Sequence, residues 1–217
     1  MDLFHLFAIV AILAIALIAY TYLSNWHSDD DTEERPRFSN NAMICVAFTI
    51  IALLAYAYGI VRADKTAFQA FQNSAVMVWV LLIGYIDWRE HIIPNDLIIS
   101  AMGFRTVTAL IETVTGQSSA RTVLLNSLTG FFAVGLLLLI VAVIAKSALG
   151  MGDVKMYAVL GLFYGLFGAY SILLISVVIM AIISIILLLI KKVTVKTALP
   201  MAPFAAIGTL IYLLSGN

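Results

Sequence analysis

Cysteine and histidine are scarce in this sequence. Among 217 residues it has one cysteine, Cys45, and three scattered histidines, His5, His27 and His91. A single cysteine excludes an internal disulfide, and the histidines show no spacing typical of a structural zinc site. No glycine-rich loop follows an expected strand, so no motif for a nucleotide cofactor is present. We therefore expect neither a metal nor a cofactor.

Charge is also scarce, while apolar residues are abundant. Only 11% of the residues are charged, and 12 basic residues balance 12 acidic ones. A neutral chain gives no electrostatic argument for a nucleic-acid partner. Because 63% of the residues are hydrophobic, the composition indicates a multi-pass membrane protein whose surroundings are the lipid bilayer.

Long apolar runs predict the fold class. A helix needs about 20 apolar residues to cross a bilayer. The first run lacks the basic start of a cleavable signal peptide, so we expect it to be retained. The chain is predicted to be an all-α bundle of about eight spans, at Leu3–Leu23, Ala42–Val61, Ala70–Asp87, Asn95–Thr115, Thr122–Lys146, Val154–Tyr170, Ser171–Ile190 and Ala198–Leu214.

The sixth of these spans is short, and little more than Gly168–Tyr170 separates it from the seventh. This pattern allows either a tight hairpin or a partly re-entrant segment, because irregular backbone is tolerated in a membrane only inside the protein.

Basic residues predict the orientation, since they are enriched in cytoplasmic loops. With eight spans, one side holds only Arg62, Lys65 and Arg121, and Arg105 lies within the fourth span. The other side, which we expect to face the cytoplasm, holds Arg35, Arg37, Arg89, Lys146, Lys155, Lys191, Lys192 and Lys196. Both termini are then outside the cytoplasm, and Asp87 and Asp153 share the cytosolic side.

Asp153 lies in a polar segment with two glycines, Gly150–Lys155, between two apolar stretches. A carboxylate at membrane depth is costly, which favours a functional role. Two close carboxylates share a proton, so one can activate a water while the other donates to a carbonyl. A structural alternative is that Asp153 is a helix N-cap and that Asp87 only ends the third span.

Three motifs in order strengthen the functional interpretation: Asp87–Asn95 (DWREHIIPN), Gly150–Lys155 (GMGDVK) and Leu199–Phe204 (LPMAPF). Between residues 79 and 207 the chain resembles the type IV prepilin peptidases, membrane aspartyl proteases related to archaeal preflagellin peptidases. The resemblance implies a single membrane domain over residues 1–217, with a peptidase core at about 70–214. It makes Asp87 and Asp153 the catalytic pair, with substrate-binding or supporting roles for Gly150, Gly152, Lys155, Pro94 and Asn95.

The resemblance also implies a substrate and a location. The enzyme would lie in the cytoplasmic membrane and cut, on the cytosolic face, the leader of a prepilin or pseudopilin, after a glycine that precedes an apolar N-terminal helix. Longer bacterial members carry an N-terminal region with paired cysteines, associated with zinc and with methylation of the new N-terminus. This chain has only Cys45 and the acidic loop Ser24–Asn41 there, so methyltransferase activity is doubtful. The acidic loop would attract basic leaders or would simply be solvated.

Two other functions are compatible with intramembrane carboxylates. A presenilin-like protease is disfavoured because its motif of a tyrosine followed directly by an aspartate is absent: Ile86 separates Tyr85 from Asp87. A proton- or cation-coupled transporter would use Asp87, Asp153 and Arg105 as relay sites.

Further polar residues near these positions have structural interpretations. Arg105 is expected to be paired or to snorkel. Glu112 lies seven residues later on the same helical face, too far for a contact between neighbouring turns, although both side chains could point into one polar interior. Asp96 and Glu90 flank the turn and could in principle replace Asp87, but Asp96 is expected to be a capping or first-turn charge. His91 would face Asp87 only if the helix continued, which the nearby Pro94 disfavours.

Overall fold

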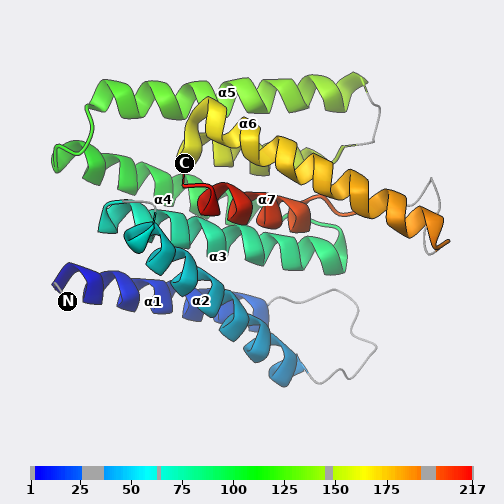
Figure 1. Cartoon of the computed structure of the whole chain (residues 1–217), viewed down its shortest axis with the longest axis horizontal. Helices are drawn as coiled ribbons and strands as arrows, with labels where there is room; N and C mark the ends of the chain where they lie inside the picture. Colours follow the sequence, from blue (N-terminus) through cyan, green and yellow to red (C-terminus); the bar gives the residue numbers. More distant parts are fainter. Residues whose placement is uncertain (1–2, 26–36, 63–64, 145–148, 192–198, 217) are drawn as a thin grey trace. The chain divides into compact units, whose positions relative to one another are not determined.

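The computed structural model describes residues 3–25, 37–62, 65–144, 149–191 and 199–216, and these residues form helices and short connections with no strand. The predicted all-α class is confirmed. In the described part of the chain, six helices are long and apolar enough to cross a membrane and α7 is shorter, which supports a multi-pass protein. The helices in chain order (Figure 1) are α1 (Leu3–Asn25), α2 (Arg37–Val61), α3 (Ala67–Glu90), α4 (Asn95–Val114), α5 (Ala120–Ile144), α6 (Met151–Leu189) and α7 (Ala202–Leu214).

Some sequence predictions fall outside the described residues. They concern the acidic side chains Asp29, Asp30, Asp31, Glu33 and Glu34 and the basic residues Arg35, Lys146, Lys192 and Lys196. The orientation in the membrane, with both termini outside, stays a prediction.

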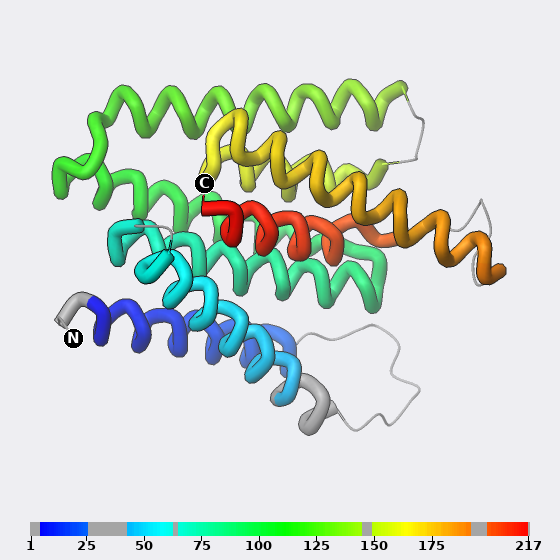
Figure 2. Tube along the Cα trace, viewed as in Figure 1, coloured from blue at the N-terminus to red at the C-terminus, as the bar shows by residue number. Residues whose placement is uncertain are grey.

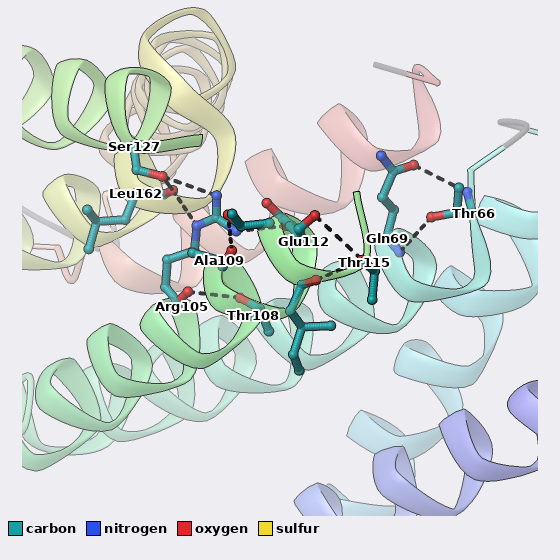
Figure 3. Close-up of polar contacts among 11 residues, drawn as sticks. Thr66, Gln69, Arg105, Thr108, Ala109, Glu112, Thr115, Ser127 and Leu162 are labelled. Carbon is teal, nitrogen blue, oxygen red and sulfur yellow. Dashed lines mark hydrogen bonds and ion pairs between the residues drawn. The ribbon is translucent and has the colours of Figure 1, made fainter. Parts of the chain in front are cut away.

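The chain divides into two compact units, and the first covers Met1–Leu82. Within it α1 packs on α2, where His5 Nδ1 and Tyr56 Oη share a hydrogen bond of 2.7 Å. The start of α3 has a reciprocal cap (Figure 3): the Gln69 N–H donates to Thr66 Oγ1 and the Thr66 N–H donates to Gln69 Oε1, each over 3.2 Å. Such a capping box satisfies two N–H groups that a helix start leaves without partners.

The second unit covers Ile83–Ser215 and contains both predicted catalytic aspartates. Its closest helix contact joins α5 to α6 at Gly130 and Gly161, where a Cβ on either glycine would overlap the backbone of the other helix. Small residues at such a crossing let two membrane helices touch through their backbones. The first half of α6 is thus anchored to α5.

The helix α6 is broken at Gly165, where the chain reverses direction (Figure 2). The backbone there has φ 66° and ψ −171°, a conformation that only glycine adopts readily. Tyr157 and Ser176 interact across the break, although they would lie about 28 Å apart along one straight helix. The halves correspond to the predicted sixth and seventh spans, so with α1–α5 and α7 the described residues contain eight apolar segments.

The hairpin was predicted at Gly168–Tyr170, and that position is wrong by several residues. Gly168 lies inside the second half of α6 and is buried. A Cβ on it would lie 2.7 Å from Tyr164 Cβ and from Tyr212 Oη, so this glycine serves packing. The reversal requires a backbone conformation that α-helical Gly168 does not have.

A buried ionic cluster holds this reversal (Figure 3). Arg105 donates from Nε to the Leu162 carbonyl over 2.9 Å, forms an ion pair from Nη1 to Glu112 Oε1 over 2.8 Å, and donates from Nη2 to Ser127 Oγ over 3.1 Å. Ser127 Oγ also donates to the Leu162 carbonyl, over 2.9 Å. The break at Gly165 interrupts the helical hydrogen bonds near this carbonyl, and two side chains from other helices bind it instead. We call Arg105, Glu112 and Ser127 the α6 clamp.

The clamp agrees with the expected structural pairing of Arg105, which is 7% exposed. Glu112 is indeed beyond the neighbouring turn, but both side chains point into one polar interior, as the sequence allowed, and they form an ion pair there. Seven residues are two helical turns, about 10 Å, and the long arginine side chain spans much of that distance along the buried face of α4.

Candidate active site

Asp87 lies in the last turn of α3 and is 6% exposed. Its Oδ2 accepts a hydrogen bond of 3.0 Å from the backbone N–H of Ala202, the first residue of α7. A helix N-terminus favours a negative charge, so α7 supports a carboxylate at this position. Gly84 permits the approach, since a Cβ there would lie 3.2 Å from Pro203 Cα. The Leu199–Phe204 motif therefore lies against the end of α3.

Asp153 lies in the first turn of α6, but it is not the N-cap. Gly150 is the N-cap residue, so the N-cap alternative for Asp153 is wrong. The Asp153 carboxylate reaches back and accepts a backbone hydrogen bond from Gly150. Its Oδ1 atom is buried and has no hydrogen-bond partner. Buried polar atoms are normally paired, so this oxygen is available to a water molecule or a substrate carbonyl.

The structure brings the two aspartates together across 66 residues of sequence. Their charges are close enough to interact. The aspartates are close because the start of α6 packs on the turn between α3 and α4. A Cβ on Gly152 would lie only 2.9 Å from Ile93 Cβ in this turn. The start of α6 is thus packed directly on the segment that follows Asp87.

The supporting residues from the motifs lie around this contact. Pro94 is buried and is the N-cap of α4, with φ −64° and ψ 132°, and Asn95 is the first helical residue. Lys155 Nζ donates to Asn95 Oδ1 over 2.9 Å. In this structure the exposed Lys155 therefore links the two motifs. Asp96 is an exposed first-turn charge of α4, as expected.

Three groups near the aspartates were missed or discounted from the sequence. His91 follows the end of α3 with φ 55° and interacts electrostatically with Asp87; its spacing of four residues from Asp87 pointed to this interaction. The Ala202 N–H, which binds Asp87, is a backbone group, so no residue type in the sequence pointed to it. Tyr157 is one helical turn after Asp153 and interacts with it, again at a spacing of four.

Among the described residues, no group of three or more His, Cys, Asp or Glu side chains is arranged to hold a metal ion. Cys45 is buried in α2. What the site offers is a pair of carboxylates at helix ends, one held by a backbone N–H and the other with an unpaired oxygen. This arrangement suits acid and base chemistry on one water molecule.

Residues 74–185, slightly more than half of the chain, match the type IV leader peptidase family. The chain belongs to this family. The matched region contains both aspartates and ends before α7. Family membership favours the protease interpretation and gives no support to a transporter.

A curated relative agrees with this assignment. The chain is 27% identical over 138 residues to the prepilin leader peptidase/N-methyltransferase of Bacillus subtilis (strain 168). The alignment covers 64% of this chain and 53% of the relative, so the chain spans about half the length of that protein. The relative's name includes the methyltransferase activity that the sequence analysis holds doubtful for this chain. No solved structure matches the chain.

Proposed function

We propose that this protein is a membrane-embedded aspartic endopeptidase that removes the leader peptide of type IV prepilin-like proteins. The observation that carries the proposal is the proximity of Asp87 and Asp153 at the ends of two helices distant in sequence. Family membership supports the reaction class.

The reaction needs one ionised and one protonated carboxyl group. The ionised group takes a proton from a water molecule, and the resulting hydroxide attacks the carbonyl carbon of the scissile peptide bond. The protonated group donates a hydrogen bond to the carbonyl oxygen, where negative charge develops. Collapse of the tetrahedral intermediate breaks the C–N bond, and the amine leaves with a proton from the pair. Asp87 and Asp153 perform these two roles as a unit.

The proposed location is the cytosolic face of the cytoplasmic membrane. Two observations support it: both aspartates lie within a few residues of a helix end, and basic residues are concentrated in the loops of that side. A substrate with its apolar helix in the bilayer and its leader in the cytosol would present the scissile bond at this depth. Binding of the helix in the membrane would then align the peptide bond with the carboxyl pair.

The test is cleavage of a prepilin-like substrate by the purified full-length protein in detergent. Asp87→Asn and Asp153→Asn should each reduce kcat by about 10³-fold or more, because each removes a proton-transfer group. Asp96→Asn is the matched control, since Asp96 is exposed in the neighbouring first turn of α4, and it should cleave normally. Thermal unfolding of each variant checks the fold. Continued cleavage by either folded variant at the two proposed positions would refute the carboxyl pair.

A further inference from the structure

The helix α7 packs on the second half of α6 through Gly208. This glycine is buried, and a Cβ on it would overlap Ser176 Oγ and lie 2.9 Å from the Ile172 carbonyl oxygen. Ser176 and Ile172 are both 0% exposed. The backbones of the two helices therefore touch here, as small residues permit in membrane proteins.

The atoms opposite Gly208 have little freedom to move. The Ile172 carbonyl belongs to the α6 backbone, and Ser176 Oγ donates its hydrogen to this carbonyl over 2.6 Å. A close-packed interior transmits an overlap as displacement. An added Cβ would therefore displace α7 relative to α6, by about 1 Å for an overlap with atoms that prefer ordinary van der Waals separation.

The same helix carries the N–H group that binds Asp87. Ala202 is 0% exposed and donates from its backbone N–H to Asp87 Oδ2 over 3.0 Å. It precedes Gly208 by six residues, which is about 9 Å of helix. A displacement of α7 at Gly208 therefore also moves this N–H, and about 1 Å is enough to lengthen or misalign a hydrogen bond.

The start of α7 is also in close contact with α3. A Cβ on Gly84 would lie 3.2 Å from Pro203 Cα and 3.3 Å from the Ala202 carbonyl oxygen. The backbone of α7 is thus held at two places, by α3 at its first turn and by α6 at Gly208. The N–H that binds Asp87 lies at the first of these places.

We propose that Gly208 is a positioning residue for Asp87: its contact with α6 places α7 so that the Ala202 N–H binds the Asp87 carboxylate. The proposal rests on the proposed peptidase function and deepens it. Gly208 lies outside the three sequence motifs, and it also lies beyond residue 185, where the match to the family ends.

The pH dependence of cleavage reports on this hydrogen bond. An N–H donor favours the charged form of a carboxylate, and kcat/KM follows the ionisation of the free enzyme. The charged groups that face Asp87 are Asp153 at the start of α6 and His91 after α3. Residues 199–214 include no acidic or basic residue, so α7 acts on Asp87 through its backbone.

The experiment measures kcat, KM and the pH profile of kcat/KM for Gly208→Ala, with the full-length protein and a prepilin-like substrate in detergent. We expect kcat to fall about tenfold or more with KM within about threefold of the wild type, because the reacting group is misaligned. The profile should move to higher pH by about 0.5–1 unit, since the carboxylate loses a donor. Adding Ser176→Ala removes an overlapping atom and should restore part of kcat.

Gly168→Ala is the matched control on the same pair of helices. An added Cβ there would lie 2.7 Å from Tyr164 Cβ and from Tyr212 Oη, which belongs to the last turn of α7. These are side-chain atoms far from Ala202, so the overlap can be relieved without moving the start of α7. This variant should unfold at a lower temperature, with kcat within about twofold of the wild type and an unchanged pH profile.

Gly84→Ala displaces the same N–H more gently, because the overlap with α7 is only a few tenths of an ångström. It should move the pH profile in the same direction and lower kcat about 2- to 5-fold. If thermal unfolding shows that Gly208→Ala does not fold, Gly84→Ala decides the question, and an unchanged pH profile in it contradicts the proposal.

The remaining outcomes also contradict the proposal. An unchanged kcat or pH profile in folded Gly208→Ala, or an equal effect in Gly168→Ala, means that the Gly208 contact does not place the Ala202 N–H. No recovery on adding Ser176→Ala means that the loss has another origin. If Asp87→Asn still cleaves, the proposed function fails; if Asp87→Asn is inactive while Gly208→Ala and Gly84→Ala are normal, only this inference fails.

Discussion

Lys155 and Asn95 are joined by a hydrogen bond of 2.9 Å between Nζ and Oδ1, although they lie 60 residues apart. One belongs to the glycine motif that carries Asp153, and the other ends the motif that begins with Asp87. This bond connects the starts of α6 and α4, so the motif that carries Asp153 is held against the motif that carries Asp87. Several consequences of this arrangement can be measured.

Lys155→Met should weaken the connection between the two motifs without unfolding the protein. Lys155 is exposed, so we expect a stability loss below about 1 kcal/mol. A small displacement of Asp153 should lower kcat about 3- to 10-fold, since catalysis depends steeply on alignment. Asn95→Leu should have the same effect, and the double variant should lose no more than either single one. Lys191→Met, at the far end of α6, is the control; additive losses in the double variant would contradict the link.

Gly152→Ala should harm activity because the glycine is in tight contact with the α3–α4 turn. Its added Cβ would lie 2.9 Å from Ile93 Cβ, and overpacking of this kind costs about 1–3 kcal/mol. We expect kcat to fall by about tenfold or more as α6 moves from the turn. Ile93→Ala in the same chain should restore part of the loss.

Gly103 provides the control for that substitution. It lies in α4 with nothing within 4 Å of an added Cβ, so Gly103→Ala should stabilise the helix by about 0.5–1 kcal/mol and leave kcat unchanged. Thermal unfolding and cleavage assays on both variants give the comparison. A normal kcat in Gly152→Ala would show that the turn tolerates displacement and that this contact does not position Asp153.

The spans and the motif residues could be predicted because their signals are local. Apolar length locates a membrane helix, and Asp87 and Asp153 stand out as carboxylates at helix ends. The exact position of the α6 reversal could not be predicted in this way. Gly165 and Gly168 are alike in sequence, and the choice between them depends on the Leu162 carbonyl being bound by Arg105 and Ser127 from other helices.

The groups that contact the aspartates could not be predicted from the sequence either. The Ala202 N–H that binds Asp87 belongs to the backbone, so no residue type marks it in advance. His91 was discounted because Pro94 disfavours a continuing helix; α3 does end at Glu90, yet the residue after it still comes within electrostatic reach of Asp87. Long-range packing, which residue patterns do not encode, decides both cases.

Arg105→Met should destabilise the second unit strongly. It removes the arginine from its ion pair with Glu112, whose side chain is 14% exposed, and breaking a buried ion pair from one side costs about 3–5 kcal/mol. The double variant Arg105→Met/Glu112→Met should recover much of this loss, because no uncompensated charge remains. Arg121→Met, an exposed control on α5, should be neutral. Thermal unfolding in detergent measures each; equal stability of Arg105→Met and Arg121→Met would show that the clamp contributes nothing.

Gly165→Ala tests whether the reversal of α6 supports catalysis as well as folding. The backbone at Gly165 has φ 66° and ψ −171°, and holding an alanine there costs about 1–3 kcal/mol. The cost is conformational, since a Cβ would meet only Asn126, at 3.6 Å and beyond. Relief of this strain by straightening the chain would move the half-helix that carries Asp153, so we expect kcat to fall about tenfold or more.

Gly116→Ala separates this effect from a general loss of stability. Gly116 also has a positive φ, of 70°, but it lies between α4 and α5 with open space around it. An alanine there costs about 1–2 kcal/mol and leaves the α6 reversal intact. Both variants should therefore unfold at lower temperature, and only Gly165→Ala should lose kcat at a temperature where both are folded. Equal kcat values in the two folded variants would mean that Asp153 keeps its place without the reversal at Gly165.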